Sequence, residues 1–274
     1  MKLPRLLITG ASGWIGKSLY SHLEKFDPIG VYYNSTLTLP PRGWVRADLR
    51  NEAEVAALLQ QIQPDVIFHF AALPSPRINR EQPTLAEATN LGVTKNLVAH
   101  LSEGTHIIFL SSDKVFNGRD PAPTEETVPD PFTFYGQLKV QCENIISKAH
   151  SKYHVLRLAT VHGLGDRASN SFIDRALEDL TLGKQVDAFQ NISRCYTRIG
   201  ELVDVLVRLI DDEHYGIYNM GSPLNTYYER IRDLCEETGI AWRGKLLATD
   251  GDVLPGIQNL NTDKLRKLLN CSFT

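Results

Sequence analysis

The fold of this chain is decided by one short stretch, Thr9-Gly10-Ala11-Ser12-Gly13-Trp14-Ile15-Gly16. The apolar run 6–8 comes just before it and is typical of a buried β-strand. Just after it, Ile15, Leu19 and Leu23 recur at the spacing of one helix face. The stretch is therefore predicted to be the turn between a strand and a helix.

The glycines of this turn indicate a site for a phosphate-bearing ligand. Glycine allows a sharp turn and a close approach of the backbone to a ligand. The N–H groups and the positive dipole end of the following helix attract a pyrophosphate. The spacing is GxxGxxG, which differs from the GxGxxG of the usual dinucleotide fingerprint. Because the turn joins the first strand to the first helix, the sequence still predicts a nucleotide site.

Length and composition narrow the class of protein. The 274 residues suffice for one large domain or for a core domain with a smaller lobe. A net charge of −3 disfavours a dedicated nucleic-acid binder, and no apolar run reaches membrane-spanning length. The first strand begins almost at the first residue, so we expect no signal peptide and a cytoplasmic protein. The four cysteines have no paired spacing, which predicts free thiols, no disulfide and no metal site.

Predicted strands and helices alternate along the first part of the chain. Strands are expected at 29–33, 44–47, 66–70, 107–110 and 154–158, with helices at 52–62, 84–101 and 134–149. Apolar strands that alternate with helices predict a doubly wound α/β fold, with a parallel sheet covered on both faces. The pattern changes after His162. We therefore expect a nucleotide-binding domain at 1–164 and a smaller substrate lobe at 165–274, of which about 198–221 returns to the sheet.

Two motifs in the first domain suggest acid–base chemistry. Tyr135 and Lys139 are four residues apart on a predicted helix, so they share one face. An ammonium group beside a tyrosine stabilises the phenolate and lowers the pKa of the hydroxyl from its usual value of about 10. Ser112 follows a predicted strand, where parallel sheets place their ligands. The alternative is a chance YxxxK on a solvated helix, with Ser112 and Asp113 forming a turn cap.

Taken together, the motifs resemble the extended short-chain dehydrogenase/reductases, and most of all their dTDP-4-dehydrorhamnose reductase branch. This resemblance implies a Rossmann-type fold and covers nearly the whole chain. It rests on residues 9–16, 47–49, 64–67, 69–72, 111–118, Glu125, Pro131, 135–139, Glu143, 157–163 and 218–222.

The resemblance also implies a role for each motif residue. Tyr135 would donate a proton to a ketone, Ser112 would polarise its carbonyl, and Lys139 would hold the nicotinamide ribose. Asp48 and Leu49 would contact adenine, and Ala71 and Ala72 would line the cofactor groove. The full set expected to bind the cofactor is Gly10, Ser12, Gly13, Trp14, Ile15, Gly16, Asn34, Ser35, Asp48, Leu49, Ala71, Ala72, Tyr135 and Lys139.

The end of the second strand favours NADP(H) over NAD(H). An NAD site usually carries an acid here, about 20 residues past the glycines, on the ribose 2′-hydroxyl. This strand instead ends without an acid, and Asn34 or Ser35 can hydrogen-bond a 2′-phosphate. The nearest cation downstream of this strand end is Arg42.

Departures from the branch concern the substrate. Lys114 stands where the reductases usually carry a tyrosine, Thr160 where they carry a tryptophan, and Arg77 lies in a changed segment. These residues, with a supporting role for Asp113, are candidates to bind an anionic or differently substituted substrate. Asn170 and Arg194 match positions that hold the nucleotide diphosphate. The alternatives are surface charges for Lys114 and Arg77, a helix cap for Asn170 and a structural arginine at 194.

The sequence therefore predicts an NADP-dependent reductase of a keto group, with a nucleotide-activated sugar as its expected substrate. Two alternatives stay open: an epimerase or dehydratase that retains its cofactor, and a regulatory subunit like the beta subunit of methionine adenosyltransferase. No nucleic-acid or membrane partner is expected. The resemblance also implies a homodimer, because members of the family are commonly dimers.

Overall fold

The computed structural model describes residues 3–34, 40–163, 169, 171–239, 243–252 and 257–274. The chain forms two compact units. The first comprises Met1–Val115, Pro129–Arg157 and Val203–Tyr218, and the second comprises Phe116–Val128, Leu158–Leu202 and Asn219–Thr274. Ser35 and Asn170 lie outside the described residues, and the domain boundary expected at 164 stays a prediction.

The first unit is built on a seven-stranded sheet, which confirms the predicted Rossmann-type α/β fold. Its strand order is β11 (Gly216–Met220), β6 (Tyr153–Leu158), β5 (His106–Ser112), β4 (Val66–His69), β1 (Leu6–Thr9), β2 (Ile29–Tyr32) and β3 (Trp44–Arg46). The pairs β1–β2, β2–β3, β1–β4 and β4–β5 are all parallel. All four side chains of β1 and of β4 are buried, as expected for strands covered on both faces.

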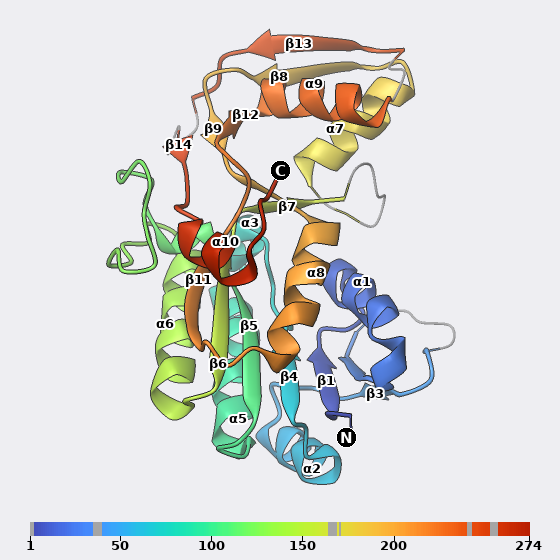
Figure 1. Ribbon diagram of the computed structural model, residues 1–274, viewed down its shortest axis with the longest axis vertical. Coiled ribbons are helices and arrows are strands. Elements are labelled where there is room, and N and C mark those ends of the chain that lie inside the picture. Colours follow the sequence, from blue (N-terminus) through green and yellow to red (C-terminus); the bar gives the residue numbers. More distant parts are fainter. Residues whose placement is uncertain (1–2, 35–39, 164–168, 170, 240–242, 253–256) are drawn as a thin grey trace. The chain divides into compact units, whose positions relative to one another are not determined.

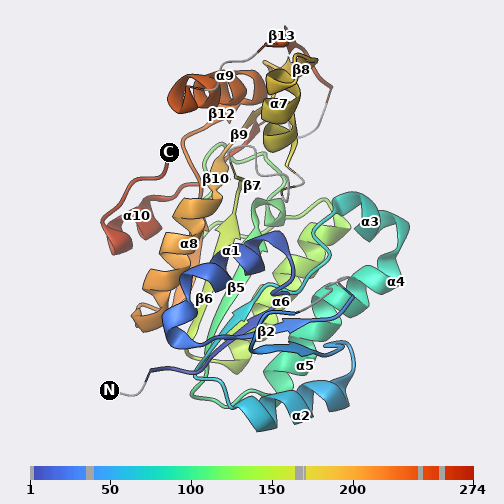
Figure 2. The same ribbon diagram turned by 90° about the vertical axis from the view of Figure 1, so that its right-hand side faces the viewer.

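Helices cover both faces of this sheet. Figures 1 and 2 show α1 on one face and α2, α5 and α6 on the other. The helical elements of the first unit are α1 (Trp14–His22), η1 (Glu24–Phe26), α2 (Glu52–Ile62), α3 (Pro76–Glu81), α4 (Pro83–Ala86), η2 (Glu87–Gly92), α5 (Val93–His100), η3 (Asp113–Val115), α6 (Phe134–Ala149), most of α8 (Ile199–Arg208) and η4 (Leu209–Asp211). Apolar residues of these helices, such as Val55, Leu97 and Leu138, complete the core against the strands.

The helix predicted at 84–101 is interrupted. It begins as α4, passes through a π-helical turn, η2, and continues as α5. Asn90 lies in this π turn and is buried, with its amide bonded to the backbone N–H and C=O of Leu73 and to Asn79. These bonds join residues distant in sequence, which is why helical periodicity alone did not reveal the bulge.

The second unit consists of short strands and two longer helices. Its pairs and small sheets are formed by β7 (Thr160–His162), β8 (Gln185–Phe189), β9 (Ser193–Arg194), β10 (Tyr196–Arg198), β12 (Asn225–Thr226), β13 (Lys245–Thr249) and β14 (Ile257–Gln258). Its helices are α7 (Phe172–Thr181), α9 (Tyr227–Thr238) and α10 (Asp263–Leu269). In Figure 1, α7 and α9 lie beside β8 and β13, and their apolar faces form a second core. Within the described ranges, no helix has the length and apolarity needed to cross a membrane.

Candidate active site and cofactor site

The glycine turn brings two strand ends together. Gly10 has φ +67°, a left-handed conformation that side chains rarely adopt. A Cβ on Gly10 would lie 2.8 Å from the backbone nitrogen of Ala71, and one on Gly16 would lie 2.4 Å from the carbonyl oxygen of Gly10. The turn therefore packs directly on the segment that follows β4. Glycine is required at both positions because no larger residue fits.

The same turn opens the N-terminus of α1. Gly13 is the N-cap residue and makes no side-chain capping bond. Ser12, Trp14 and Ile15 are half-buried around it. Because a helix N-terminus presents N–H groups and a positive dipole end, this cradle suits a pyrophosphate. The residues present therefore fit the nucleotide cofactor expected from the sequence.

A buried polar network of Thr9, His69 and Thr94 holds the end of β1 against the segment that follows β4. The hydroxyl oxygen of Thr9 accepts hydrogen bonds from the backbone N–H groups of Phe70 and Ala71, at 3.0 and 3.1 Å. His69 lies between the hydroxyls of Thr9 and Thr94, with N···O distances of 3.0 and 2.9 Å. Burial lowers the pKa of His69 to about 3, so the ring is neutral at pH 7.

Acid is expected to destabilise the first unit through its buried histidines. Burial lowers the pKa of His69 to about 3 and that of His106 to about 4, from 6.5 in an unfolded chain. Between pH 6.5 and 4 the unfolded chain binds protons that the folded chain does not, so stability falls as the pH falls. Each histidine contributes up to about 1.4 kcal/mol per pH unit. Urea unfolding at pH 7.5 and pH 5 measures this slope.

The control for this pH effect is an exposed histidine. His22→Gln should leave the slope unchanged, because its ring is exposed. His69→Asn should reduce the slope while lowering stability at every pH. A urea midpoint that does not change between pH 7.5 and pH 5 would contradict the neutral buried state.

The predicted serine, tyrosine and lysine meet at the carboxyl end of β5. Ser112 ends that strand, and Tyr135 and Lys139 lie one turn apart on α6. The Ser112 side chain lies close enough to the Tyr135 hydroxyl to lower its pKa, and the Lys139 ammonium lies 5.7 Å from the centroid of the Tyr135 ring. Lys139 also donates a hydrogen bond of 2.8 Å to the carbonyl of Leu110. Tyr135 and Lys139 are only 8% and 4% exposed.

A glycine sets the distance between α6 and the serine. A Cβ on Gly136 would lie 2.1 Å from the carbonyl oxygen of Lys114, so the helix rests directly on η3. Thr133 caps the helix by accepting a bond of 3.0 Å from the N–H of Gly136. The first turn of α6, which carries Tyr135, is therefore fixed against the end of β5.

Burial, rather than neighbouring charge, has the largest effect on the pKa values of Tyr135 and Lys139. Burial raises the pKa of the Tyr135 hydroxyl, and the carboxylate of Asp113 raises it further, whereas the neighbouring Ser112 side chain lowers it. Burial also lowers the pKa of Lys139 to about 8. The YxxxK spacing predicted a lowered pKa for Tyr135, but its pKa is raised. Helical spacing does not reveal how deeply the two side chains are buried.

A buried ion pair, which the sequence did not reveal, lies behind the three residues. Arg157 donates a bond of 2.8 Å to Glu143, and the hydroxyl of Ser111 donates one of 2.5 Å to the same carboxylate. The side chains of Arg157 and Glu143 are 2% and 4% exposed. The group joins β5, α6 and β6 directly beside Ser112. Glu143 lies one turn beyond Lys139, but its partner on β6 is visible only in the folded chain.

Asp48 and Leu49, the residues expected to contact adenine, follow β3 and lie beside the charged side chain of Arg50. The carboxylate of Asp48 accepts two bonds from Arg50, at 2.8 and 2.7 Å, and these lower the pKa of Asp48. Leu49 is buried, and Asn34 is exposed just beyond β2. Ala71 and Ala72 are half-buried after β4. The binding roles of these residues stay predictions.

The candidate substrate residues of the first unit form two ion pairs. Lys114 contacts Asp113 at 3.2 Å, beside Ser112. Arg77 contacts Glu81 at 2.8 Å on the exposed surface of α3. Within the described ranges, no cluster of three or more His, Cys, Asp or Glu side chains is arranged to hold a metal ion.

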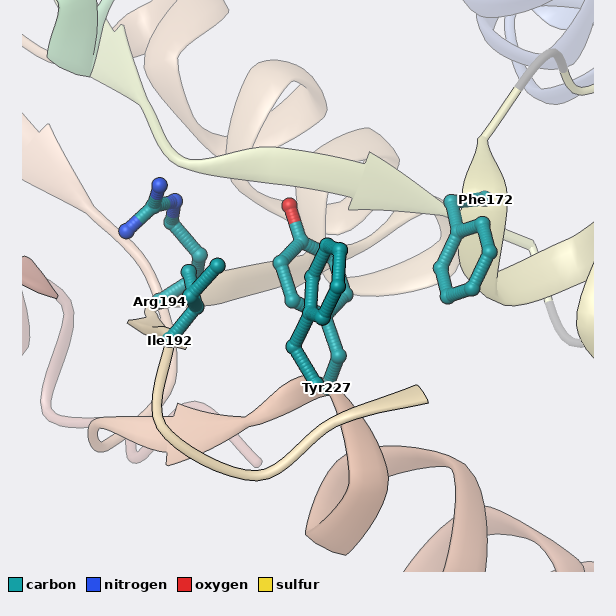
Figure 3. A pocket seen from close by; sticks show the side chains of 5 residues that line it. Phe172, Ile192, Arg194 and Tyr227 are labelled. Carbon is teal, nitrogen blue, oxygen red and sulfur yellow. The ribbon is translucent and has the colours of Figure 1, made fainter. Parts of the chain in front are cut away.

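The second unit places Arg194 in a pocket. Thr160 lies on β7, whereas Arg194 lies on β9 and is 5% exposed. The pocket has a volume of about 150 Å³, and its lining consists of Phe172, Phe189, Ile192, Arg194 and Tyr227. In the view of Figure 3, Tyr227 stands between Phe172 and the guanidinium of Arg194. The pocket thus combines flat aromatic walls with one buried positive charge.

Comparison with known proteins gives relatives of the same fold. The chain is 30% identical over 237 residues to the methionine adenosyltransferase 2 subunit beta of Xenopus tropicalis, covering 82% of this chain and 69% of that protein. A hypothetical dTDP-4-dehydrorhamnose reductase from Sulfolobus tokodaii superposes with a TM-score of 0.85 at 23% identity, over 98% of this chain and 96% of the other.

A second solved structure carries a cofactor. The dTDP-4-dehydrorhamnose reductase of Bacillus anthracis, in complex with NADP, superposes with a TM-score of 0.78 at 21% identity, over 99% of this chain and 94% of the other. The family model described as the RmlD substrate binding domain matches residues 4–240. The chain therefore belongs to the RmlD substrate-binding-domain family, with the Rossmann-type fold of the extended short-chain dehydrogenase/reductases.

Proposed function

We propose that the protein is an NADP-dependent reductase that converts a keto group of a nucleotide-activated sugar into a hydroxyl group. The buried Tyr135, with Ser112 beside it and Lys139 one turn away on α6, carries this proposal. They lie at the carboxyl end of β5, in the same sheet as the glycine turn that follows β1. Parallel sheets bind their ligands at this edge.

The chemistry assigns one task to each of the three side chains. The nicotinamide cofactor supplies the hydride that forms the new C–H bond. Tyr135 transfers its hydroxyl proton to the carbonyl oxygen, and Ser112 donates a hydrogen bond to that oxygen as negative charge develops. The Lys139 ammonium stabilises the phenolate that remains. Tyr135 then regains a proton from solvent, so atoms and charge balance over the cycle.

The pocket of the second unit supplies the support for a nucleotide-activated substrate. Arg194 brings a buried positive charge that suits a diphosphate, as the sequence resemblance implies. Phe172 and Tyr227 offer flat apolar surfaces on which a base can stack, with their rings 5.5 Å apart and nearly perpendicular. Thr160, Lys114 and Arg77 remain candidates for contacts with the sugar.

Oxidation of NADPH by the purified protein tests this function. We expect turnover with members of a panel of 4-keto nucleotide sugars and little turnover with simple ketones of similar size that lack the nucleotide. The simple ketones are the control, because they share the reactive group but lack the nucleotide. Bound NADPH without turnover on any ketone would contradict the proposal.

One observation favours a second candidate function. The 30% identity to a methionine adenosyltransferase beta subunit extends over 82% of this chain. A regulatory subunit would bind a methionine adenosyltransferase catalytic subunit in gel filtration and change its kinetics. Such binding, without any ketone reduction, would favour this candidate over the reductase.

A further inference from the structure

The ends of β2 and β3 meet beside the cofactor turn. The two strands are parallel, and their register pairs Tyr32 with Arg46, the last residue of β3. In turn β2 is paired in parallel with β1, so all three strands end at the edge of the sheet that carries Gly10. In a dinucleotide site, the residue at the end of the second strand contacts the 2′-position of the adenosine ribose. Arg46 therefore lies next to the position that distinguishes NADP from NAD.

Two arginines lie near the Tyr33 ring, and they differ in their partners. The guanidinium carbons of Arg46 and Arg50 lie 5.6 and 4.9 Å from its centroid. Arg50 is held by Asp48 through two hydrogen bonds, so its charge is balanced. Arg46 is exposed, donates one bond of 3.3 Å to the carbonyl of Tyr33, and has no carboxylate within 4 Å among the described residues. The backbone bond and the aromatic ring hold this guanidinium at the strand end.

The surrounding sequence contains nothing that would compete for this positive charge. No Asp or Glu occurs from Pro28 through Ala47, which includes the residues outside the described ranges. A carboxylate at the end of β2 would repel a 2′-phosphate and accept a bond from a 2′-hydroxyl. Here the first acid after β2 is Asp48, which is already paired with Arg50.

Arg42, the cation that the sequence suggested for the 2′-phosphate, lies at the wrong edge of the sheet. Arg42 comes before β3, whose first residue, Trp44, pairs with Gly30 near the start of β2. The carbonyl of Arg42 accepts a bond of 2.6 Å from the hydroxyl of Tyr20, and the carbonyl of Gly43 accepts one of 3.2 Å from Gly30. These bonds place Arg42 at the amino edge of the sheet, away from the turn at Gly10.

We propose that Arg46 is the residue that binds the 2′-phosphate of NADP(H) and sets the preference over NAD(H). The proposal rests on the proposed function, because it concerns the cofactor of the same site. A guanidinium matches a phosphate in both charge and hydrogen-bond geometry. Tyr33 orients Arg46, and the Asp48–Arg50 pair keeps the neighbouring carboxylate from neutralising it.

Equilibrium binding of two adenosine nucleotides tests this role without any substrate. Calorimetric titrations with adenosine 2′,5′-bisphosphate and adenosine 5′-monophosphate differ only in the 2′-phosphate. We expect Arg46→Ala to weaken binding of the bisphosphate on the order of tenfold to a hundredfold, the range of charge-assisted hydrogen bonds, and to leave the monophosphate unchanged. Fluorescence titrations should show the same loss for NADPH and none for NADH.

Three further variants distinguish the effect of Arg46 on binding from the effects of neighbouring residues. Arg42→Ala removes the same charge at the amino edge and should change neither affinity. Arg46→Lys keeps the charge but loses the planar fork, so its affinity for the bisphosphate should lie between those of the wild type and Arg46→Ala. Asn34→Asp, which introduces a carboxylate just beyond β2, should weaken binding of the bisphosphate and leave binding of the monophosphate unchanged.

The outcomes distinguish this proposal from the proposed function. An unchanged ratio of the two affinities in Arg46→Ala would overturn the role of Arg46 while leaving the nucleotide site in place. Wild-type protein that binds neither nucleotide would overturn both proposals. Selective loss in Arg46→Ala, in a protein that reduces no ketone, would support Arg46 and contradict the reductase.

Discussion

Tyr135→Phe is expected to lower kcat by about two to four orders of magnitude, which is the range for loss of a general acid. The variant keeps the buried ring in the first turn of α6 but lacks the proton that completes ketone reduction. Binding of NADPH should persist, because Lys139 and the glycine turn are unchanged. Steady-state kinetics on a ketone that the wild type reduces, together with fluorescence titration of NADPH, measure both effects.

Tyr153→Phe is the matched control for this experiment. It removes a tyrosine hydroxyl from the start of β6, at the opposite edge of the same sheet. Its kcat should stay close to that of the wild type. A Tyr135→Phe variant that retained most of its activity would show that another group donates the proton.

Arg157→Met is expected to destabilise the first unit by about 3–5 kcal/mol, the cost of leaving a buried carboxylate without its partner. Glu143 is 4% exposed and receives hydrogen bonds from Arg157 and Ser111. In the variant this carboxylate must remain charged in an apolar setting or take up a proton. Urea unfolding of both proteins at pH 7.5 gives the difference in free energy.

A double-mutant cycle separates the ion pair from the packing of its side chains. Glu143→Leu combined with Arg157→Met should destabilise the unit by less than the sum of the single changes, because no unpaired charge remains. Arg5→Met provides an exposed comparison: its partner Asp65 is 47% exposed, and the expected loss is below about 1 kcal/mol. Strictly additive effects at Glu143 and Arg157 would contradict the coupling.

The sequence determined the features that depend on local backbone conformation and on periodicity. The glycine turn, the apolar strands and the helical spacing of Tyr135 and Lys139 all involve residues close together in the chain. Their conformations follow from allowed dihedral angles and from the repeats of strands and helices. For that reason the fold class and the placement of Tyr135 and Lys139 on one helix face were predictable, whereas the role of Ser112 beside them was implied by the family resemblance.

Tertiary structure decided what depends on strand register and burial. The register of β2 with β3 places Arg46, rather than Arg42, at the cofactor edge. Packing of α6 against β5 and β6 pairs Glu143 with Arg157 and buries Tyr135, so that the pKa of its hydroxyl rises. These contacts join residues that are more than ten positions apart in the sequence. No local pattern encodes them, because they depend on which surfaces meet when the sheet and its helices assemble.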